Sequence, residues 1–179
     1  MKVQTALAIL ASLVSGILAA TVADVQSDIS TIASQISTLD NAITAFPATG
    51  GSLLNALAIH TDSTNLVTSV NKGTTDVTAV TPKPFSEADG KSILSAVQAF
   101  EPGILDALKE IVIKKPAFQA LPLGGIPALV KQDLINLNAS TFAFEAALIA
   151  SAPADLIPTA NSIKSTVDAA FATAIAAYS

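Results

Sequence analysis

The stretch Val22–Phe46, VADVQSDISTIASQISTLDNAITAF, decides the fold of this chain. Its large apolar residues recur at intervals of three and four among small and polar residues, which places them in one narrow stripe of a long α-helix. Such a stripe needs partner helices that bury it. It consists of Val22, Val25, Ile29, Ile32, Ile36, Leu39, Ile43 and Phe46.

Proline and glycine divide the rest of the chain into further segments with the same periodicity. Pro47 and Gly50-Gly51 end the first helix, and Ser52 is expected to cap a second one, reaching Val80. The prolines of 81–84 break the chain, after which Ser86 and the acid three residues later resemble a capping box that starts a third helix.

Two more helices are predicted, from Pro127 to about Leu148 and from Ile163 to Tyr178. Pro102 removes a backbone donor inside the third helix, so a kink or short break is expected near 98–103. The apolar segment 114–127 has three prolines and two adjacent glycines. We expect it to be an ordered, non-helical connection that lies over one end of the fold. It would act either as a lid or as a simple cap on the core. The sequence therefore predicts an all-α protein, a single antiparallel five-helix bundle with a central hydrophobic cavity.

The first twenty residues have the layout of a secretory signal peptide. Lys2 supplies a positive charge, 6–18 is nearly all apolar, and Ala19 and Ala20 offer a small-residue cleavage site. A membrane anchor is the weaker alternative, because the run is short for a span of about 20 residues and is interrupted by serines and a glycine. We find no second run of spanning length, and so expect residues 21–179 to form one secreted domain without stable membrane insertion.

Composition narrows the classes of function. The chain has no cysteine, so the fold must rest on packing without disulfides. Arginine is absent, and the eight lysines beyond residue 20 face 14 acidic residues, a net charge of −6 that disfavours nucleic acid and anionic membranes as partners. Tryptophan is absent and aromatic residues are few, so stacking platforms for bases or sugars are also disfavoured.

No constellation of residues typical of an enzyme is found. His60 is the only histidine, there is no thiol, and no Gly-x-Ser-x-Gly elbow occurs. The acidic residues lie singly along helix faces, without the spacing of a metal site in a helical bundle. We therefore interpret the chain as a non-enzymatic protein that needs no metal or cofactor.

Two features of the predicted interior bear on function. Its lines of large apolar residues alternate with many Ala, Ser and Thr. These small side chains leave space that either closer helix packing or a ligand must fill. Ser63 and Thr141 stand on otherwise apolar lines, and a buried hydroxyl needs a partner. That partner is either the carbonyl one turn back or the head group of a bound apolar molecule.

Several runs of residues resemble the fungal cell-wall mannoproteins grouped with hydrophobic surface binding protein A. They are FPATGGS at 46–52, EADGK at 87–91, the helix 104–111 followed by KKPAF at 114–118, VKQDL at 130–134, and the closing alanine-rich helix. The resemblance covers essentially all of residues 21–179 and is a diffuse pattern of apolar and small residues.

The resemblance implies a secreted five-helix domain that holds long-chain fatty acids, including arachidonate, in a hydrophobic central cavity. Members from pathogenic fungi look like scavengers of host lipid signals, with a role in virulence, and others adsorb to hydrophobic surfaces, so surface adhesion is the alternative function. The chain lacks the Ser/Thr-rich stalk and anchor signal of wall-anchored members, which leaves retention at the cell wall open.

Specific residues are expected to contact such a lipid. Its carboxylate would be held by inward hydroxyls, because no arginine is available and the lysines are expected mostly on outward faces. The candidates for the head group are Ser63 and Thr141, then Ser34, Gln35, Ser162 and Ser165. The candidates for the acyl tail are Ile32, Ile36, Leu66, Val70, Val97, Phe100, Leu134, Leu137, Phe144, Val167 and Phe171.

One sequon is present. Asn138-Ala139-Ser140 is the single Asn-x-Ser/Thr sequence of the chain, so N-glycosylation of Asn138 is predicted if this side chain faces outward, with an unmodified surface asparagine as the alternative.

Overall fold

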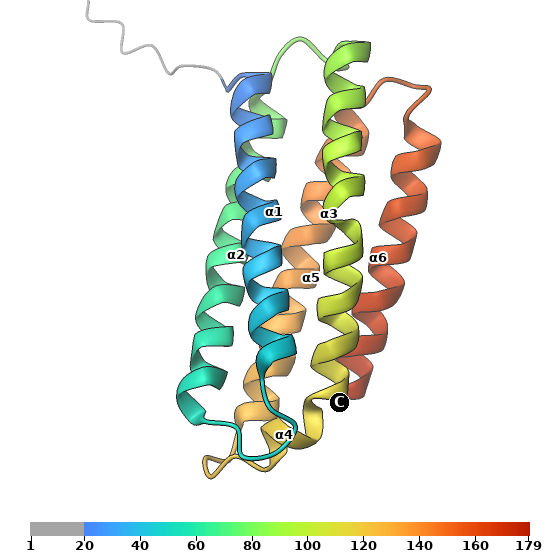
Figure 1. Ribbon diagram of the computed structural model, residues 1–179. Helices are drawn as coiled ribbons and strands as arrows, with labels where there is room; N and C mark the ends of the chain where they lie inside the picture. Colours follow the sequence, from blue (N-terminus) through green and yellow to red (C-terminus); the bar gives the residue numbers. More distant parts are fainter. Residues whose placement is uncertain (1–19) are drawn as a thin grey trace, which may run out of the picture.

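The computed structural model describes residues 20–179, in which five long helices stand side by side and one short helix lies at one end of them (Figure 1). The predicted signal peptide, residues 1–20, lies almost entirely outside the described residues. The helices are α1 (Val22–Ala45), α2 (Leu53–Ala79), α3 (Glu87–Ile113), α4 (Lys115–Gln119), α5 (Ile126–Ser151) and α6 (Ile157–Ala177).

The five long helices form a closed ring. Each packs on two neighbours in the cyclic order α1, α2, α5, α6, α3, and α3 returns to α1. Consecutive long helices run antiparallel, as predicted, but a ring of five cannot alternate throughout, and here α2 and α5, α1 and α3, and α3 and α6 are parallel neighbours (Figure 1). No long helix occupies the middle of this ring, so side chains alone must fill its interior.

The stripe of α1 faces that interior. Thr21 caps the helix, since its hydroxyl accepts a hydrogen bond from the Asp24 backbone N–H, and the Asp24 carboxylate accepts one from the Thr21 backbone N–H in return. Of the eight predicted stripe residues all but the half-buried Val22 are buried. A hydrophobic stripe of seven buried side chains stabilises the helix far more than its own propensity does.

Other predicted helix starts are confirmed. The hydroxyl of Ser52 accepts from the Asn55 N–H, and that of Ser86 accepts from the Asp89 N–H. The C-terminal helix begins at Ile157, six residues earlier than predicted, because Pro158 occupies its first turn, where a missing N–H leaves no bond unmade.

Two local predictions need correction. Helix α3 runs through Pro102 without the short break that was one of the two outcomes expected there, and a kink stays a prediction. The connection after it, predicted as non-helical, contains α4, with Pro116 in its first turn where proline is compatible with a helix.

Helix α5 is more apolar than the sequence analysis recognised. By length and composition alone it is apolar enough to cross a membrane, which corrects our finding that no second run of spanning length follows the first. In the fold it packs on α2, α6 and α4, which cover part of its apolar surface, whereas Ile135 and Phe142 stay exposed.

The segment around α4 closes one end of the bundle, here called the lower end. Phe118 of α4 is 1% exposed, and its ring stacks on that of Phe46 with centroids 4.4 Å apart. Lys114 donates hydrogen bonds to the carbonyl oxygens of Thr44 and Phe46, and the Tyr178 hydroxyl donates to that of Ile111. The predicted placement of this connection over one end of the bundle is confirmed.

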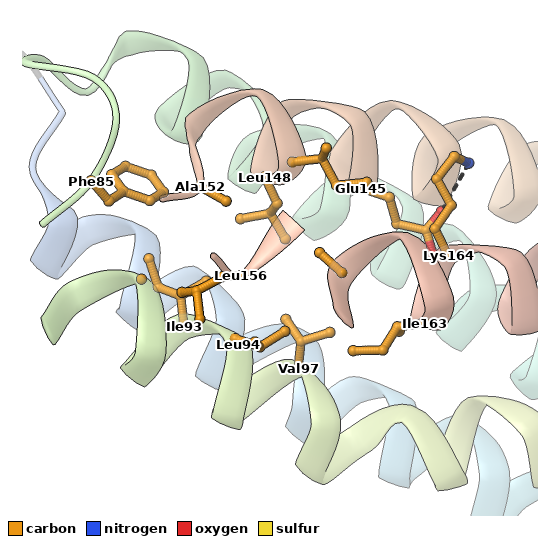
Figure 2. Close-up of a pocket in the computed structure, with 13 residues that line it drawn as sticks. Phe85, Ile93, Leu94, Val97, Glu145, Leu148, Ala152, Leu156, Ile163 and Lys164 are labelled. Atoms are coloured by element: carbon orange, nitrogen blue, oxygen red, sulfur yellow. Dashed lines mark hydrogen bonds and ion pairs between the residues drawn. The ribbon is translucent and has the colours of Figure 1, made fainter. Parts of the chain in front are cut away.

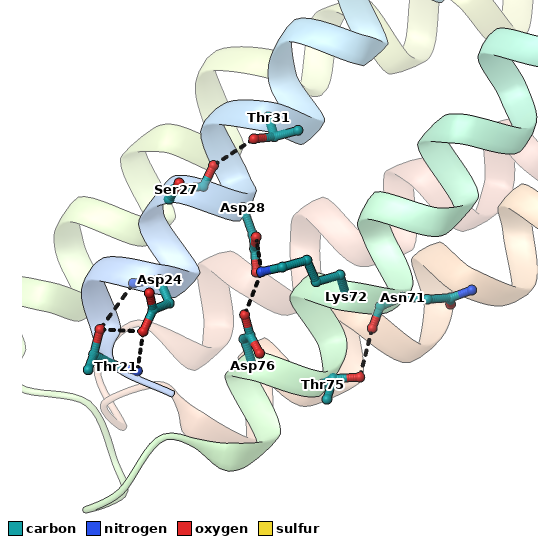
Figure 3. A network of polar contacts seen from close by, with 9 residues as sticks. All are labelled: Thr21, Asp24, Ser27, Asp28, Thr31, Asn71, Lys72, Thr75 and Asp76. Atoms are coloured by element: carbon teal, nitrogen blue, oxygen red, sulfur yellow. Dashed lines mark hydrogen bonds and ion pairs between the residues drawn. The ribbon is translucent and has the colours of Figure 1, made fainter. Parts of the chain in front are cut away.

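A polar network joins α1 to α2 towards the opposite, upper end (Figure 3). The Lys72 ammonium lies 2.6 Å from Asp28 of α1 and 2.7 Å from Asp76 of its own helix. Asp28 is buried, and this burial raises the pKa of its carboxyl in spite of the lysine. The network therefore links α1 to α2 through a lysine that contacts one acid on each helix.

Candidate functional site

The middle of the ring contains an apolar pocket to which all five long helices contribute. We call it the central pocket. Thr141 supplies the one side-chain hydroxyl among its lining residues. These residues are Ile32, Ile36 and Leu39 of α1, Leu66 and Val70 of α2, Phe100, Ile104, Ala107 and Leu108 of α3, Leu137, Thr141 and Phe144 of α5, and Phe171 of α6.

A second pocket, the lower pocket, continues the central one towards α4. The two share Leu39, Ala107, Leu108 and Leu137, so they adjoin along the bundle axis. Its polar lining residues are Ser63 and Asp133. The remaining lining residues are Ile43, Ile59, Ile111, Val130 and Leu134.

Ser63 is an unusual polar group in this wall. Its residue is 3% exposed, and its Oγ atom has neither solvent contact nor a hydrogen-bond partner. Serines in helices commonly donate to the carbonyl one turn back, as several threonines of this chain do. An unpaired hydroxyl that borders a pocket has free energy to gain from a ligand that accepts its hydrogen bond.

A third pocket, the upper pocket, lies between α3, α5 and α6 and shares no lining residue with the other two. Figure 2 shows its apolar walls, with Phe85 at one end and the charged pair Glu145 and Lys164 at the other. It is the one pocket of the three that a lysine lines.

The pockets are small as they stand. The central one has a cavity volume of about 70 Å³ and the other two about 50 Å³ each. Since one water needs roughly 15 Å³ of such volume, the central pocket holds no more than a few atoms. A long acyl chain therefore requires the walls to move apart. On α3 the lining residues Val97, Phe100 and Ile104 are only half-buried.

Together the pockets follow the bundle axis. On α3 the side chains that line them run from Ile93 at the upper pocket to Ile111 at the lower one. At a helical rise of about 1.5 Å per residue, this stretch measures about 27 Å. The interior is thus long, narrow and apolar, a shape that suits an extended hydrocarbon chain.

The structure gathers most of the predicted tail residues. Eight of them line the central pocket, Leu134 lines the lower one and Val97 the upper one, whereas Val167 is buried in the core and lines none of the three. The eight are Ile32, Ile36, Leu66, Val70, Phe100, Leu137, Phe144 and Phe171.

Only some of the predicted polar residues line a pocket. Ser63 and Thr141 each line a pocket, as described. Gln35 is half-buried with an unpaired, buried Oε1 atom, but it lines none of the three pockets. Three predicted serines are exposed and line none of the three pockets: Ser34, Ser162 and Ser165. Successive side chains of a helix point about 100° apart, so a residue next to an inward position does not itself point inward.

Lys164 is an exception to the expectation that the lysines lie mostly on outward faces or in loops. Its side chain is only 18% exposed, and its ammonium lies 3.2 Å from Glu145 of α5 and 2.8 Å from Asp168. In sequence, Lys164 and Asp168 form an i, i+4 pair that is typical of a solvated helix face. No local signal distinguishes this pair from a surface pair, since its burial comes from the neighbouring helix.

His60 does not form a catalytic triad. Its Nδ1 atom lies 2.9 Å from both carboxylate oxygens of Asp133, which resembles the acid and base of a hydrolase. The nearby Ser63 hydroxyl has no hydrogen-bond partner, however, so the base does not contact it. The pair is better described as a polar link between α2 and α5.

A closed ring of five helices around apolar pockets defines a class of helical bundles with a hydrophobic interior. The sequence profile described as hydrophobic surface binding protein A matches residues 22–150. The chain belongs to this family. No curated protein sequence matches the chain.

Solved structures share the fold over nearly their whole length. The chain is similar to Afmp4p, crystallised in complex with palmitic acid, with 34% identity and a TM-score of 0.80 over 88% of this chain and 99% of that one. It also resembles ligand-binding domain 1 of the Penicillium marneffei MP1 protein, complexed with arachidonic acids, at 18% identity and a TM-score of 0.77 over 88% and 99%. Domain 2 of the same protein, complexed with multiple arachidonic acids, gives 16% and 0.74 over 86% and 93%. At these lower identities the likeness to MP1 concerns the fold.

Proposed function

We propose that this protein binds long-chain fatty acids in the central and lower pockets, without catalysing a reaction. The observation that carries the proposal is a pocket lined by side chains from all five helices of the ring, almost entirely apolar, in a chain 34% identical to a protein crystallised with palmitic acid. An acyl chain there would occupy the interior of the ring, where no helix lies.

The energetics favour such a ligand. Each buried methylene contributes roughly 0.8 kcal/mol, so a chain of about sixteen carbons offers on the order of 12 kcal/mol before the costs of ordering and of widening the pocket. Micromolar affinity corresponds to about 8 kcal/mol. The surplus leaves room for the side-chain movements that the small cavities require.

The carboxylate would lie in the lower pocket or at its junction with the central one. Ser63 offers an unpaired hydroxyl there, and Thr141 offers the hydroxyl of the central pocket. The acyl tail would then extend along Ile36, Val70 and Phe144. This polarity follows from where the donors stand and agrees with the absence of arginine.

Native mass spectrometry of the protein from its secreting host tests the proposal. We expect a co-purified mass equal to one or more fatty acids, released on denaturation, and rebinding of palmitate by the delipidated protein. An empty protein that also fails to bind palmitate or arachidonate in titration calorimetry would contradict it.

Adsorption to hydrophobic surfaces is the second candidate, favoured by apolar residues that the fold leaves exposed. Leu54 is 76% exposed at the start of α2, and Leu123 is 53% exposed before α5; both segments lie at the lower end of the bundle (Figure 1). Binding of the empty protein to phenyl beads, reduced in Leu54→Ser with Leu123→Ser, would support this function.

We further propose that the mature domain begins near residue 21 and is secreted. Fractionation of the host cells would measure whether the cell wall retains it.

Asn138 stays a candidate for glycosylation. It is half-buried in the middle of α5, and Ser140 of its sequon is buried with its hydroxyl donated to the Leu137 carbonyl. Peptide mapping of the secreted protein decides whether this site is modified.

A further inference from the structure

The upper pocket has the composition of a separate binding site. It is bounded by Ile93, Leu94 and Val97 of α3 and by Leu148 and Ile149 of α5, and it shares no lining residue with the central pocket. Its α3 wall meets the other side closely, since a Cβ atom at Gly90 would come within 2.6 Å of Pro153. The charged lining residues, Glu145 and Lys164, both lie at one end (Figure 2).

This charged end holds more negative than positive groups. Lys164 contacts two carboxylates, those of Glu145 and Asp168, and its ammonium also lies 3.6 Å from the centre of the Phe142 ring. An ammonium has three N–H donors, of which these carboxylates take two. A third acceptor can therefore join Lys164 if the surplus negative charge is removed.

Glu145 is the group able to remove it. Its side chain is 13% exposed, and burial raises the pKa of its carboxyl to about 7 in spite of the hydrogen bond from Lys164. For Lys164 partial burial opposes the charged form, but hydrogen bonds to Asp168 and Glu145 outweigh it and raise the pKa. Lys164 thus stays charged while Glu145 exchanges its proton near neutral pH.

Among residues 20–179, no other charged residue lines this pocket. The lining residues of α3 are Gly90 and apolar side chains, Phe85 closes the far end, and α6 contributes Lys164, with Asp168 behind it. The protonated Glu145 carboxyl is an O–H donor beside a cation, at the end of an apolar pocket. That pair of donors matches a carboxylate attached to a hydrocarbon chain.

We propose that the upper pocket is a second acyl-chain site, in which Lys164 and Glu145 at its charged end hold the carboxylate of a fatty acid. The inference rests on the proposed function and extends it. The two sites would bind the same carboxylate head group with different donors. The central and lower pockets offer neutral hydroxyls, and the upper pocket offers an ammonium and a carboxylic acid.

The upper site is pH-dependent. With a pKa of about 7, the Glu145 carboxyl is mostly ionised at pH 8 and mostly protonated at pH 6, whereas a fatty acid with an ordinary carboxyl pKa remains ionised. Because apparent affinity scales with the competent fraction, binding at this site strengthens about tenfold from pH 8 to pH 6. Glu145→Gln keeps a donor but cannot titrate, so its upper site should be insensitive to pH.

Native mass spectrometry and calorimetry with palmitate test the inference on the delipidated domain. We expect two classes of site for the unmodified protein and loss of the pH-dependent class in Ala160→Phe, which fills the upper pocket. Lys164→Met should lose the same class, without adding bulk. Ala107→Phe, in the wall shared by the central and lower pockets, is the matched control and should lose the other class.

The outcomes separate the two proposals. If palmitate binds and Ala107→Phe abolishes all of it while Lys164→Met and Glu145→Gln change nothing, the upper site does not exist and the proposed function stands. If the unmodified protein binds no palmitate at either pH, the proposed function itself fails. Circular dichroism of each variant confirms that the helices are intact.

Discussion

Gly73 of α2 lies against Phe144 of α5 so closely that a Cβ atom at position 73 would stand 3.0 Å from the Phe144 ring. The same ring lines the central pocket. The absence of a side chain at Gly73 therefore lets Phe144 lie back against α2 and leaves room in the middle of the ring of helices.

Gly73→Ala is expected to reduce fatty-acid binding without unfolding the protein. The new methyl group would push Phe144 into the central pocket, while alanine gains about 1 kcal/mol of helix propensity over glycine. We expect a free energy of unfolding equal to or up to about 1 kcal/mol above that of the original chain, and a several-fold weaker affinity for palmitate in calorimetry.

Gly103→Ala is the control for this change. It offers the same gain in propensity on α3, but its Cβ atom would meet Ile36 at an ordinary contact distance of 3.4 Å. A loss of more than about 2 kcal/mol in Gly73→Ala alone would show that Phe144 has no room to move, which would contradict an expandable central pocket.

Phe118→Ala should destabilise the lower end of the bundle. Phe118 is almost fully buried and stacks on Phe46, so its truncation leaves a cavity and removes the aromatic pair. We expect a loss of about 3–5 kcal/mol in the free energy of unfolding, measured by urea denaturation.

The same residue bears on whether the connection 116–127 acts as a lid. A segment anchored by so buried a ring is better suited to capping the core than to opening. Gly124→Ala, where an added Cβ atom meets nothing within 4 Å, should leave palmitate uptake rates unchanged. A change in uptake without a change in stability would favour the lid instead.

The periodicity of single helices could be predicted from the sequence, because it depends on local geometry. Ser63, a polar residue on an otherwise apolar line of α2, is buried as its spacing indicated. The cyclic order of the helices, with its parallel neighbours, depends on contacts between residues distant in sequence, and no local pattern specifies it.

The candidate site shows the same division. Hydrophobic lining residues were found from their stripes, whereas Ser34 and Ser165 were assigned from mere proximity to a stripe and are exposed. Lys164 was missed because its depth is set by Phe142 and Glu145 of α5, nineteen or more residues away. The pair Lys164 and Asp168 has an ordinary i, i+4 spacing, and only the packing of α5 on α6 places it at the end of the upper pocket.

The stability of the unliganded protein should depend on pH through Glu145. Its pKa is raised in the folded state, so its contribution to stability is fully present below about pH 4.5 and is lost as the pH rises through about 7. Relative to Glu145→Gln, the original chain should therefore lose about 1–2 kcal/mol between pH 5 and pH 8, less than the full shift implies because Lys164 and solvent screen the charge.

Urea denaturation at the two pH values measures this difference. Glu87→Gln, which removes a carboxylate from an exposed pair with Lys91, controls for the change in net charge. Parallel stability profiles of the original chain and Glu145→Gln would mean that Glu145 is ionised throughout, and the proton-dependent upper site would lose its basis.

Ser63→Ala should change stability and binding in opposite directions. Removing a buried hydroxyl that has no partner is expected to raise the free energy of unfolding of the empty protein by about 1 kcal/mol. If the same hydroxyl donates to a fatty-acid carboxylate, its loss should weaken palmitate binding by about 1.5–3 kcal/mol, or roughly 10- to 150-fold. The methyl ester of palmitate, which lacks the charge, should bind both proteins with similar affinity.

Two serines of α5 serve as matched controls for this prediction. Ser151 is also buried and unpaired but lines none of the three pockets, so Ser151→Ala should raise stability and leave binding unchanged. Ser140 already donates to the Leu137 carbonyl, so Ser140→Ala should not raise stability. Equal affinity of Ser63→Ala and the original chain for palmitate, combined with equal affinity for acid and ester, would show that the pocket holds the acyl tail and that the carboxylate is bound elsewhere.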